Sequence, residues 1–408
     1  MSGISIVVPT LGRPSLAALL HALGPLPEEF ELLVVDDRAD RRAPLELPPS
    51  TPVRVIPGRA AGPAAARNAG WRAATREWVA FLDDDVLPEP GWAGRLAADL
   101  REAGPEIGGV QGNVDVPLPD GHRPTDWERV TAGLAHGEWI TADMAYRRTA
   151  LARTGGFDER LPRAFREDAE LAHRVLRAGW QLRLGHRRVT HPVRPEDRWI
   201  SVRTQRGNAD DALLRHLYGR RWRTRLGVPP GRRHRHAVIT ACLTAAVGCT
   251  TAALITGRRG WPAAAAVAAA GWAAGTAEFA AARIAPGPRD RDEVTTMLLT
   301  SAVIPPVAIA HWLRGWLRWR GAEPLPETTT GPIRVTAPSA DILLPAARAA
   351  VHAASVREAG HATSARKAAR AGSVADNGSG VNNGSGVDNG EARPVDAEPV
   401  VTRAGARR

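Results

Sequence analysis

Short apolar runs alternate with amphipathic segments along the first half of the chain. The runs are continuously apolar, as strands buried on both faces of a parallel sheet are, and they cover Ile4–Pro9, Glu31–Asp36, Val53–Pro57, Trp78–Leu82 and Ile107–Val114. Helical patterns lie between them at Ser15–Leu23, Pro63–Thr75 and Pro90–Glu102. Such alternation predicts a doubly wound α/β sheet, whose ligands bind at the carboxyl ends of the strands.

Acidic residues stand directly after two of these runs. Asp83, Asp84 and Asp85 follow Trp78–Leu82, and Asp36 and Asp37 end the second run. Adjacent carboxylates repel each other unless a cation or a hydrogen-bond donor neutralises them. Carboxylate oxygens suit Mg²⁺ or Mn²⁺, which would bridge to a diphosphate. The plain alternative is a solvated acidic turn.

A further acidic pair, Glu167 and Asp168, opens a helical pattern that runs to Ala178 and ends at Gly179. The positive end of a helix dipole favours an ionised carboxylate at this position. The pair is therefore either ordinary charge complementing the dipole or a fixed carboxylate that takes a proton during a reaction.

The ordered set of motifs carries a resemblance to a known family. Residues 4–193 contain IVVPTLGRP, ELLVVDD, GPAAARNAGWRAA, WVAFLDDDVLPEPGW, GGFDERL and REDAELAHRVLRAGW. In this order and at this spacing, the segment resembles family 2 glycosyltransferases, whose fold is GT-A. Each motif alone is weakly specific, whereas the set together is specific.

The resemblance implies a role for each matching position. Donor-binding residues would be Pro9 and Thr10 at the nucleobase, Asp36 and Asp37 holding the base, Arg67 and Asn68 near the nucleotide, and Asp84 at the ribose or metal. Asp83 and Asp85 would bind Mn²⁺ or Mg²⁺, and His191 would complete that site unless it is an ordinary structural histidine. Asp168 would be the general base, with Glu167 beside it.

The second half of the chain has a different composition. The chain carries a net charge of +11, with arginines concentrated between Arg215 and Arg235 just before three long apolar segments, Ala237–Thr256, Trp261–Ala282 and Val294–Leu313. These segments predict two or three membrane helices, with a soluble Ala-rich hairpin as the alternative. Basic clusters next to such segments favour anionic lipid, and no nucleic-acid-binding pattern accompanies them.

The predicted organisation has four parts: a GT-A domain at 1–205, a basic juxtamembrane linker at 206–236, membrane helices within 237–313 and a basic, mostly disordered tail at 314–408. No leader precedes the first apolar run, which predicts a catalytic domain facing the cytoplasm at the cytoplasmic membrane. The predicted activity is inverting, metal-dependent transfer of a sugar from a nucleotide-sugar donor to a lipid-linked or cell-envelope glycan acceptor.

Two other classes of protein remain as alternatives. A sugar-nucleotide nucleotidyltransferase shares a similar core, but it should carry a Gly-rich basic loop after the first strand, where this chain has PTLGRP. A non-catalytic membrane scaffold on a degenerate transferase domain is the other, and the intact acidic motifs speak against it.

Overall fold

A computed structural model describes residues 3–48 and 52–326. Residues 1–2, 49–51 and 327–408 lie outside the described part, and so does most of the segment predicted to be a disordered tail.

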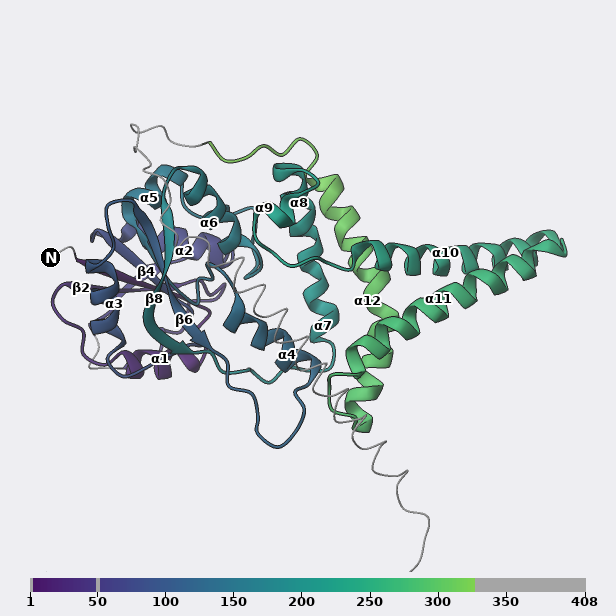
Figure 1. Cartoon of the computed structure of the whole chain (residues 1–408), viewed down its shortest axis with the longest axis horizontal. Coiled ribbons are helices and arrows are strands. Elements are labelled where there is room, and N and C mark those ends of the chain that lie inside the picture. Colours follow the sequence, from purple (N-terminus) through teal and green to yellow (C-terminus); the bar gives the residue numbers. More distant parts are fainter. Residues whose placement is uncertain (1–2, 49–51, 327–408) are drawn as a thin grey trace, which may run out of the picture. The chain divides into compact units, whose positions relative to one another are not determined.

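A mixed sheet of eight strands forms the centre of the N-terminal domain, in the order β3-β2-β1-β4-β7-β6-β8-β5 (Figure 1). The strands β3, β2, β1 and β4 run parallel, β7 is antiparallel to both β4 and β6, and β8 is parallel to β6. Their bounds are β1 Ile4–Thr10, β2 Phe30–Asp36, β3 Arg54–Pro57, β4 Trp78–Leu82, β5 Leu87–Pro88, β6 Ile107–Asp115, β7 Asp143–Arg147 and β8 Gln181–Thr190.

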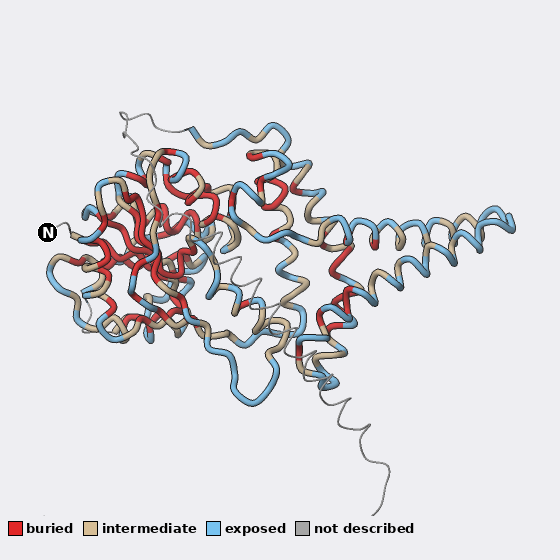
Figure 2. Tube along the Cα trace, in the orientation of Figure 1, coloured by how far each residue is buried: buried red, intermediate tan, exposed pale blue. Residues whose placement is uncertain are grey.

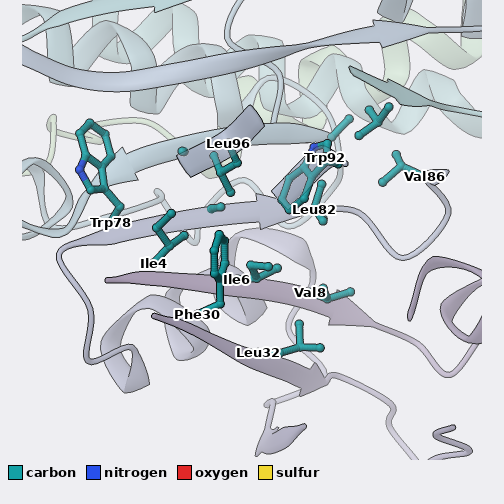
Figure 3. Close-up of a cluster of buried hydrophobic side chains, with 14 of the residues drawn as sticks. Ile4, Ile6, Val8, Phe30, Leu32, Trp78, Leu82, Val86, Trp92 and Leu96 are labelled. Carbon is teal, nitrogen blue, oxygen red and sulfur yellow. The ribbon is translucent and has the colours of Figure 1, made fainter. Parts of the chain in front are cut away.

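Helices cover both faces of this sheet. On one face Leu16, Leu19 and Leu20 of α1 and Leu96 of α3 pack into a core with Ile6 and Val8 of β1 (Figure 3). On the other face α2, α5 and α6 pack against Val7 of β1, because successive strand residues point to opposite faces. The helices are α1 Ser15–Leu23, α2 Pro63–Ala73, α3 Trp92–Arg101, α4 Asp126–Ala132, α5 Arg148–Thr154 and α6 Glu167–Arg177. The predicted doubly wound α/β sheet is confirmed.

The segment predicted as a basic linker contains helices that join the folded domain. These are α7 Ile200–Arg203, α8 Asn208–Tyr218 and α9 Trp222–Arg225. Leu213, Leu214 and Trp222 form a small buried cluster with Leu161, which lies just before the start of α6. The apolar side chains of α8 and α9 in this cluster are therefore part of the core, whereas most of the arginines between them are exposed.

Three long helices follow: α10 Arg233–Thr256, α11 Gly260–Ile284 and α12 Arg291–Arg318. The helices α10 and α11 pack side by side, and α12 contacts both of them as well as α7 and α8. Most of α10 and α11 is exposed (Figure 2). Among the described residues, α10 and α12 are the two helices that are long and apolar enough to cross a membrane.

Candidate active site

The carboxyl ends of β1, β2 and β4 come together at one edge of the sheet. Thr10 of β1 pairs in register with Asp36 of β2, and the Asp37 amide donates to the Thr10 carbonyl at 2.9 Å. Pro9 lies one residue before Thr10 on the same strand, opposite Val35. The four residues expected around the nucleobase are therefore neighbours.

Two residues near the carboxyl end of β1 hold the side chain of Asp84. The Thr10 hydroxyl donates to Asp84 Oδ2 at 2.7 Å, and Arg13 Nη1 donates to Asp84 Oδ1 at 2.9 Å. The end of β1 and the loop after it therefore fix both carboxylate oxygens of Asp84, the middle one of the three aspartates that follow β4.

Asp37 occupies a tight turn. Its two carboxylate oxygens accept from the backbone amides of Arg59 and Gly62, both at 3.0 Å. A Cβ on Gly58 would lie 2.5 Å from Asp37 Oδ1, so this approach requires glycine. Asp37 is thus held rigidly and is buried just after the end of β2.

Asp36 pairs with Arg38. Two hydrogen bonds of 2.8 Å join the Arg38 guanidinium to the two Asp36 oxygens. The hydrogen bond from Arg38 lowers the pKa of Asp36, which keeps this carboxylate ionised.

One arginine connects the two acidic motifs that the sequence sets far apart. Arg67 Nη2 donates to Asp83 Oδ1 at 2.6 Å, and its Nη1 donates to Glu167 Oε1 at 2.9 Å. The Arg67 side chain is only 2% exposed. A buried guanidinium is stable only when it is paired, so Arg67 fixes the end of β4 against the start of α6.

Glu167 and Asp168 are neighbours in different surroundings. Glu167 is buried, and burial together with the charge of Asp168 raises its pKa to about 8, although Arg67 opposes the shift. Its second oxygen, Oε2, is buried without a hydrogen-bond partner. Asp168 is half-buried, and its Oδ1 accepts from the Ala169 amide at 2.7 Å. Burial also raises the pKa of Asp168. The carboxylate that stays partly accessible is therefore Asp168.

The residue before this pair adopts an unusual backbone conformation. Arg166 has φ 76°, in the left-handed region that few residues other than glycine adopt, and it caps α6. Its Nε lies 3.7 Å from Asp211 Oδ1 of α8. Strained backbone beside functional groups persists only where its surroundings hold it, and the arginine–aspartate contact supplies part of that hold.

Asp85, the last of the three aspartates that follow β4, lies next to a histidine. Asp85 Oδ1 lies 3.6 Å from His191 Nε2, and Asp85 Oδ2 lies 3.0 Å from Arg194 Nε. Burial and the nearby charge of Asp83 raise the pKa of Asp85, against the effect of His191 and Arg194. The histidine comes from the residue after β8, so two distant segments meet here.

A divalent cation fits this edge only if another molecule shares its coordination. Within the described ranges no three His, Cys, Asp or Glu side chains form a complete protein site. The fit is nevertheless reasonable, because Mg²⁺ is usually held by one or two carboxylates with substrate phosphates and water as the other ligands. Asp85 and His191 present two ligand atoms, and Asp83 stands two residues from Asp85.

Asn68 has a structural task in addition to its predicted place near the nucleotide. Its side-chain nitrogen donates to the Phe157 carbonyl at 2.9 Å, and its oxygen accepts from the Phe157 amide at 2.9 Å. It therefore ties α2 to the loop that follows α5. Both Asn68 and Arg67 are buried.

Three arginines of this region were not identified from the sequence. Arg13, Arg166 and Arg194 contact Asp84, Asp211 and Asp85, respectively. The chain contains many arginines, so composition does not single these out. A usable signal for Arg13 was its position in the loop directly after β1, at the ligand-binding edge.

Residues 5–155 match the sequence profile described as "Glycosyl transferase family 2". A relative is the pre-mycofactocin glycosyltransferase of Mycobacterium tuberculosis, which is 33% identical over 172 residues, covering 38% of this chain and 36% of the relative. An uncharacterised glycosyltransferase of Haemophilus influenzae is 39% identical over 91 residues, covering 21% of this chain and 31% of the relative. The chain thus spans about a third of the length of these curated relatives.

Solved structures also resemble the chain. The mannosyltransferase PcManGT of Pyrobaculum calidifontis, solved with GDP-Man and Mn²⁺, gives a TM-score of 0.42 at 19% identity and covers 76% of this chain and 87% of its own. The match to glycosyl transferase family 2 covers residues 5–155, which include the carboxyl ends of β1, β2 and β4 described above.

Proposed function

We propose that the chain is an inverting glycosyltransferase that moves a sugar from a nucleotide-sugar donor to a hydroxyl of a lipid-linked or cell-envelope glycan. The observation that carries this proposal is the Arg67 bridge. It holds the end of β4, with its three aspartates, against the helix that presents Asp168. A donor-binding edge and a proton acceptor are thereby fixed relative to each other, as transfer between two substrates requires.

The donor would lie along the carboxyl ends of β1, β2 and β4. Asp37 and Thr10 would face the nucleobase, and Asp84 the ribose. The hydrogen bonds that already fix Asp37 and Asp84 favour this role, because a rigid site binds its ligand without an added ordering cost.

A divalent cation, Mn²⁺ or Mg²⁺, would be held by Asp85 and His191 with Asp83 nearby. When bound, it would neutralise the charge of the departing nucleoside diphosphate. Arg194 and Arg67 pair with Asp85 and Asp83, which supports a role for positive charge at this edge.

Asp168 would act as the general base. As the acceptor oxygen attacks the anomeric carbon, the hydroxyl proton passes to Asp168, and the bond from that carbon to the diphosphate oxygen breaks on the opposite side. The raised pKa of Asp168 brings its basicity closer to neutral pH, which favours proton transfer. Glu167 is buried and bound to Arg67, so it is less suited to this step.

The acceptor would be carried by the membrane. The exposed apolar side chains of α10 and α11 need a non-aqueous partner, and the arginines between Arg215 and Arg235 lie just before α10 in the chain. The catalytic domain would face the cytoplasm, where nucleotide sugars are made available. This arrangement brings a soluble donor and a membrane-bound acceptor to one protein.

A binding experiment tests the donor and metal together. We expect a UDP- or GDP-sugar from a panel to raise the melting temperature with Mn²⁺ and not with excess EDTA. Asp85→Ala should abolish this shift, because a buried carboxylate beside His191 is lost. The exposed Asp40 pairs only with its neighbour Arg42, so Asp40→Ala is the control and should retain the shift. Equal binding in EDTA would contradict the role of the metal.

A further inference from the structure

A cavity of about 1000 Å³ lies next to the proposed active site, outside the strand ends that would bind the donor. Its walls come from the segment after β6, from α4, from residues 192–205, and from the end of α11 with the first half of α12. The volume is at the upper end of that of small-molecule sites. Segments from both halves of the chain thus build one chamber.

This cavity shares a wall with the predicted metal site. Arg194 lines the cavity, and its Nε lies 3.0 Å from Asp85 Oδ2. Trp127 of α4 lines the cavity as well, and its indole nitrogen donates to the Arg194 carbonyl at 2.9 Å. A molecule held in the cavity would therefore lie one side chain away from the aspartate that is expected to bind the donor diphosphate.

Among the charged side chains of the lining, acidic ones outnumber basic ones. In a chain of net charge +11, this excess of acid is a local feature. Carboxylate oxygens accept hydrogen bonds from hydroxyl groups and repel phosphates. The acidic side chains of the lining include Asp126, Glu128, Glu196, Asp197, Asp292 and Glu293.

Arg283, a buried arginine of the cavity lining, already has hydrogen-bond partners within the protein. Arg283 donates to Thr300 at 2.7 Å, to Ser301 at 3.0 Å, to Ser201 at 3.0 Å and to Asp126 at 2.7 Å. Its guanidinium ties α11 to α12 and α4, so it is not available to an anionic ligand. Arg194 is likewise paired with Asp85, and Arg198 is the third arginine of the lining.

The helix α12 lines the cavity and has apolar side chains both inside the cavity and on its exposed side. Met297 and Ile304 of α12 line the cavity, whereas Leu298 and Leu299 are exposed on the outside of the same helix. An apolar chain can therefore contact α12 from outside while its polar end lies in the cavity. Trp127 offers an aromatic face of the kind that packs against a sugar ring.

We infer that this cavity binds the acceptor, and that the acceptor has an uncharged, hydroxyl-rich head group attached to an apolar chain. The inference rests on the proposed function. It adds the location of the acceptor and the chemistry of its head group, for which the excess of acidic side chains in the lining favours an uncharged group over an anionic lipid phosphate. The hydroxyl that reacts would enter past Arg194 toward Asp168.

The test uses the full chain in membranes of the cells that naturally carry it, with the radiolabelled nucleotide sugar that binds in the panel. Labelled product is extracted with chloroform and methanol and passed over an anion exchanger at neutral pH. Release of nucleoside diphosphate to water is measured separately, with detergent-purified full chain and no acceptor. We expect extractable product that flows through the exchanger.

Two variants fill the cavity from opposite walls. Thr296→Trp on α12 and Val130→Trp on α4 should each lower transfer at least 10-fold, while slow release of nucleoside diphosphate to water stays unchanged. Thr295→Trp, one residue before Thr296, adds the same volume to an exposed position of α12 that does not line the cavity, and it should leave transfer unaltered. Unchanged diphosphate release also shows that a variant is folded.

Each contrary result has a distinct meaning. Product retained by the exchanger, or product found only in water, would overturn the assigned acceptor chemistry. Full transfer by both cavity variants would overturn the location. No diphosphate release by the wild-type chain would overturn the proposed function, and this inference with it.

Discussion

The strand-end site and the α10–α11 hairpin differ in the side chains that they bury. The site buries charged and polar side chains, whereas the hairpin exposes apolar ones. The site buries the charge of Arg67 and pairs it with Asp83 and with the carboxyl group of Glu167. The hairpin exposes apolar side chains, with Leu254 83% and Ile255 78% exposed. A buried charge costs free energy unless it is paired, and an exposed apolar surface costs free energy in water. Under the proposed function, the first region contacts a charged substrate and the second contacts lipid.

The largest expected effect comes from removing the cation that holds the site together. Arg67→Met leaves Asp83 and Glu167 without their buried partner, and breaking a buried pair costs about 3–5 kcal/mol of unfolding free energy. Chemical denaturation in detergent measures this change.

The matched control is Arg72→Met on the same helix. Arg72 is half exposed and pairs with Glu159, so the loss should stay within about 1 kcal/mol. Equal losses for the two variants would mean that the Arg67 bridge is no stronger than a surface pair.

A lysine in the hairpin should produce the next largest effect. Val247 of α10 is 59% exposed, so Val247→Lys is harmless on a soluble surface but costs about 2.5–3.5 kcal/mol in the middle of a membrane helix. We expect the variant to be recovered partly in the supernatant after carbonate extraction, whereas the wild-type chain stays with the membranes.

The control for that comparison is Leu176→Lys at the exposed end of α6, which should leave the distribution unchanged. Complete recovery of the wild-type chain in the supernatant would contradict the membrane role of the hairpin. The transferase proposal would survive that result, but the acceptor proposal would lose its main support.

The smallest effect concerns pH. The pKa of Glu167 rises from 4.5 to about 8 in the folded protein, so the folded state keeps a proton that the unfolded state loses above about 4.5. The free energy of unfolding should therefore decrease as pH rises between these two values. Glu167→Gln should flatten this part of the profile, measured by denaturation at several pH values.

The exposed residue Glu28 provides the control, and Glu28→Gln should retain the wild-type slope. An unaltered slope in Glu167→Gln would assign the pH dependence to another group.

Local patterns were enough to predict the strand-end acids and the α6 acids. Continuous apolar runs define β1, β2 and β4, and a carboxylate after a parallel strand lies at the ligand-binding edge by geometry alone. The helix that begins at Glu167 was equally readable, because Leu171 and Val175 lie on its buried face. Whether these residues act as assigned stays a prediction.

Local sequence patterns could not predict which side chains pair when segments distant in the sequence come together. The contact of Arg67 with both Asp83 and Glu167 depends on how α2 packs between two distant segments. The helix α8 was hidden by its arginine-rich surroundings, although Leu213 and Leu214 are fully buried. The cavity beside Arg194 likewise requires α4, α11 and α12 to meet.

The most direct test of the account is the turnover of Asp168→Asn. We expect this variant to fold and to bind the donor with unchanged affinity, because Asp168 is expected to contact the acceptor and not the nucleotide. Its rate of sugar transfer should drop by roughly 10²-fold or more, the usual scale for loss of a general base. A transfer rate close to that of the wild-type chain would contradict the account and would point to Glu167 as the base.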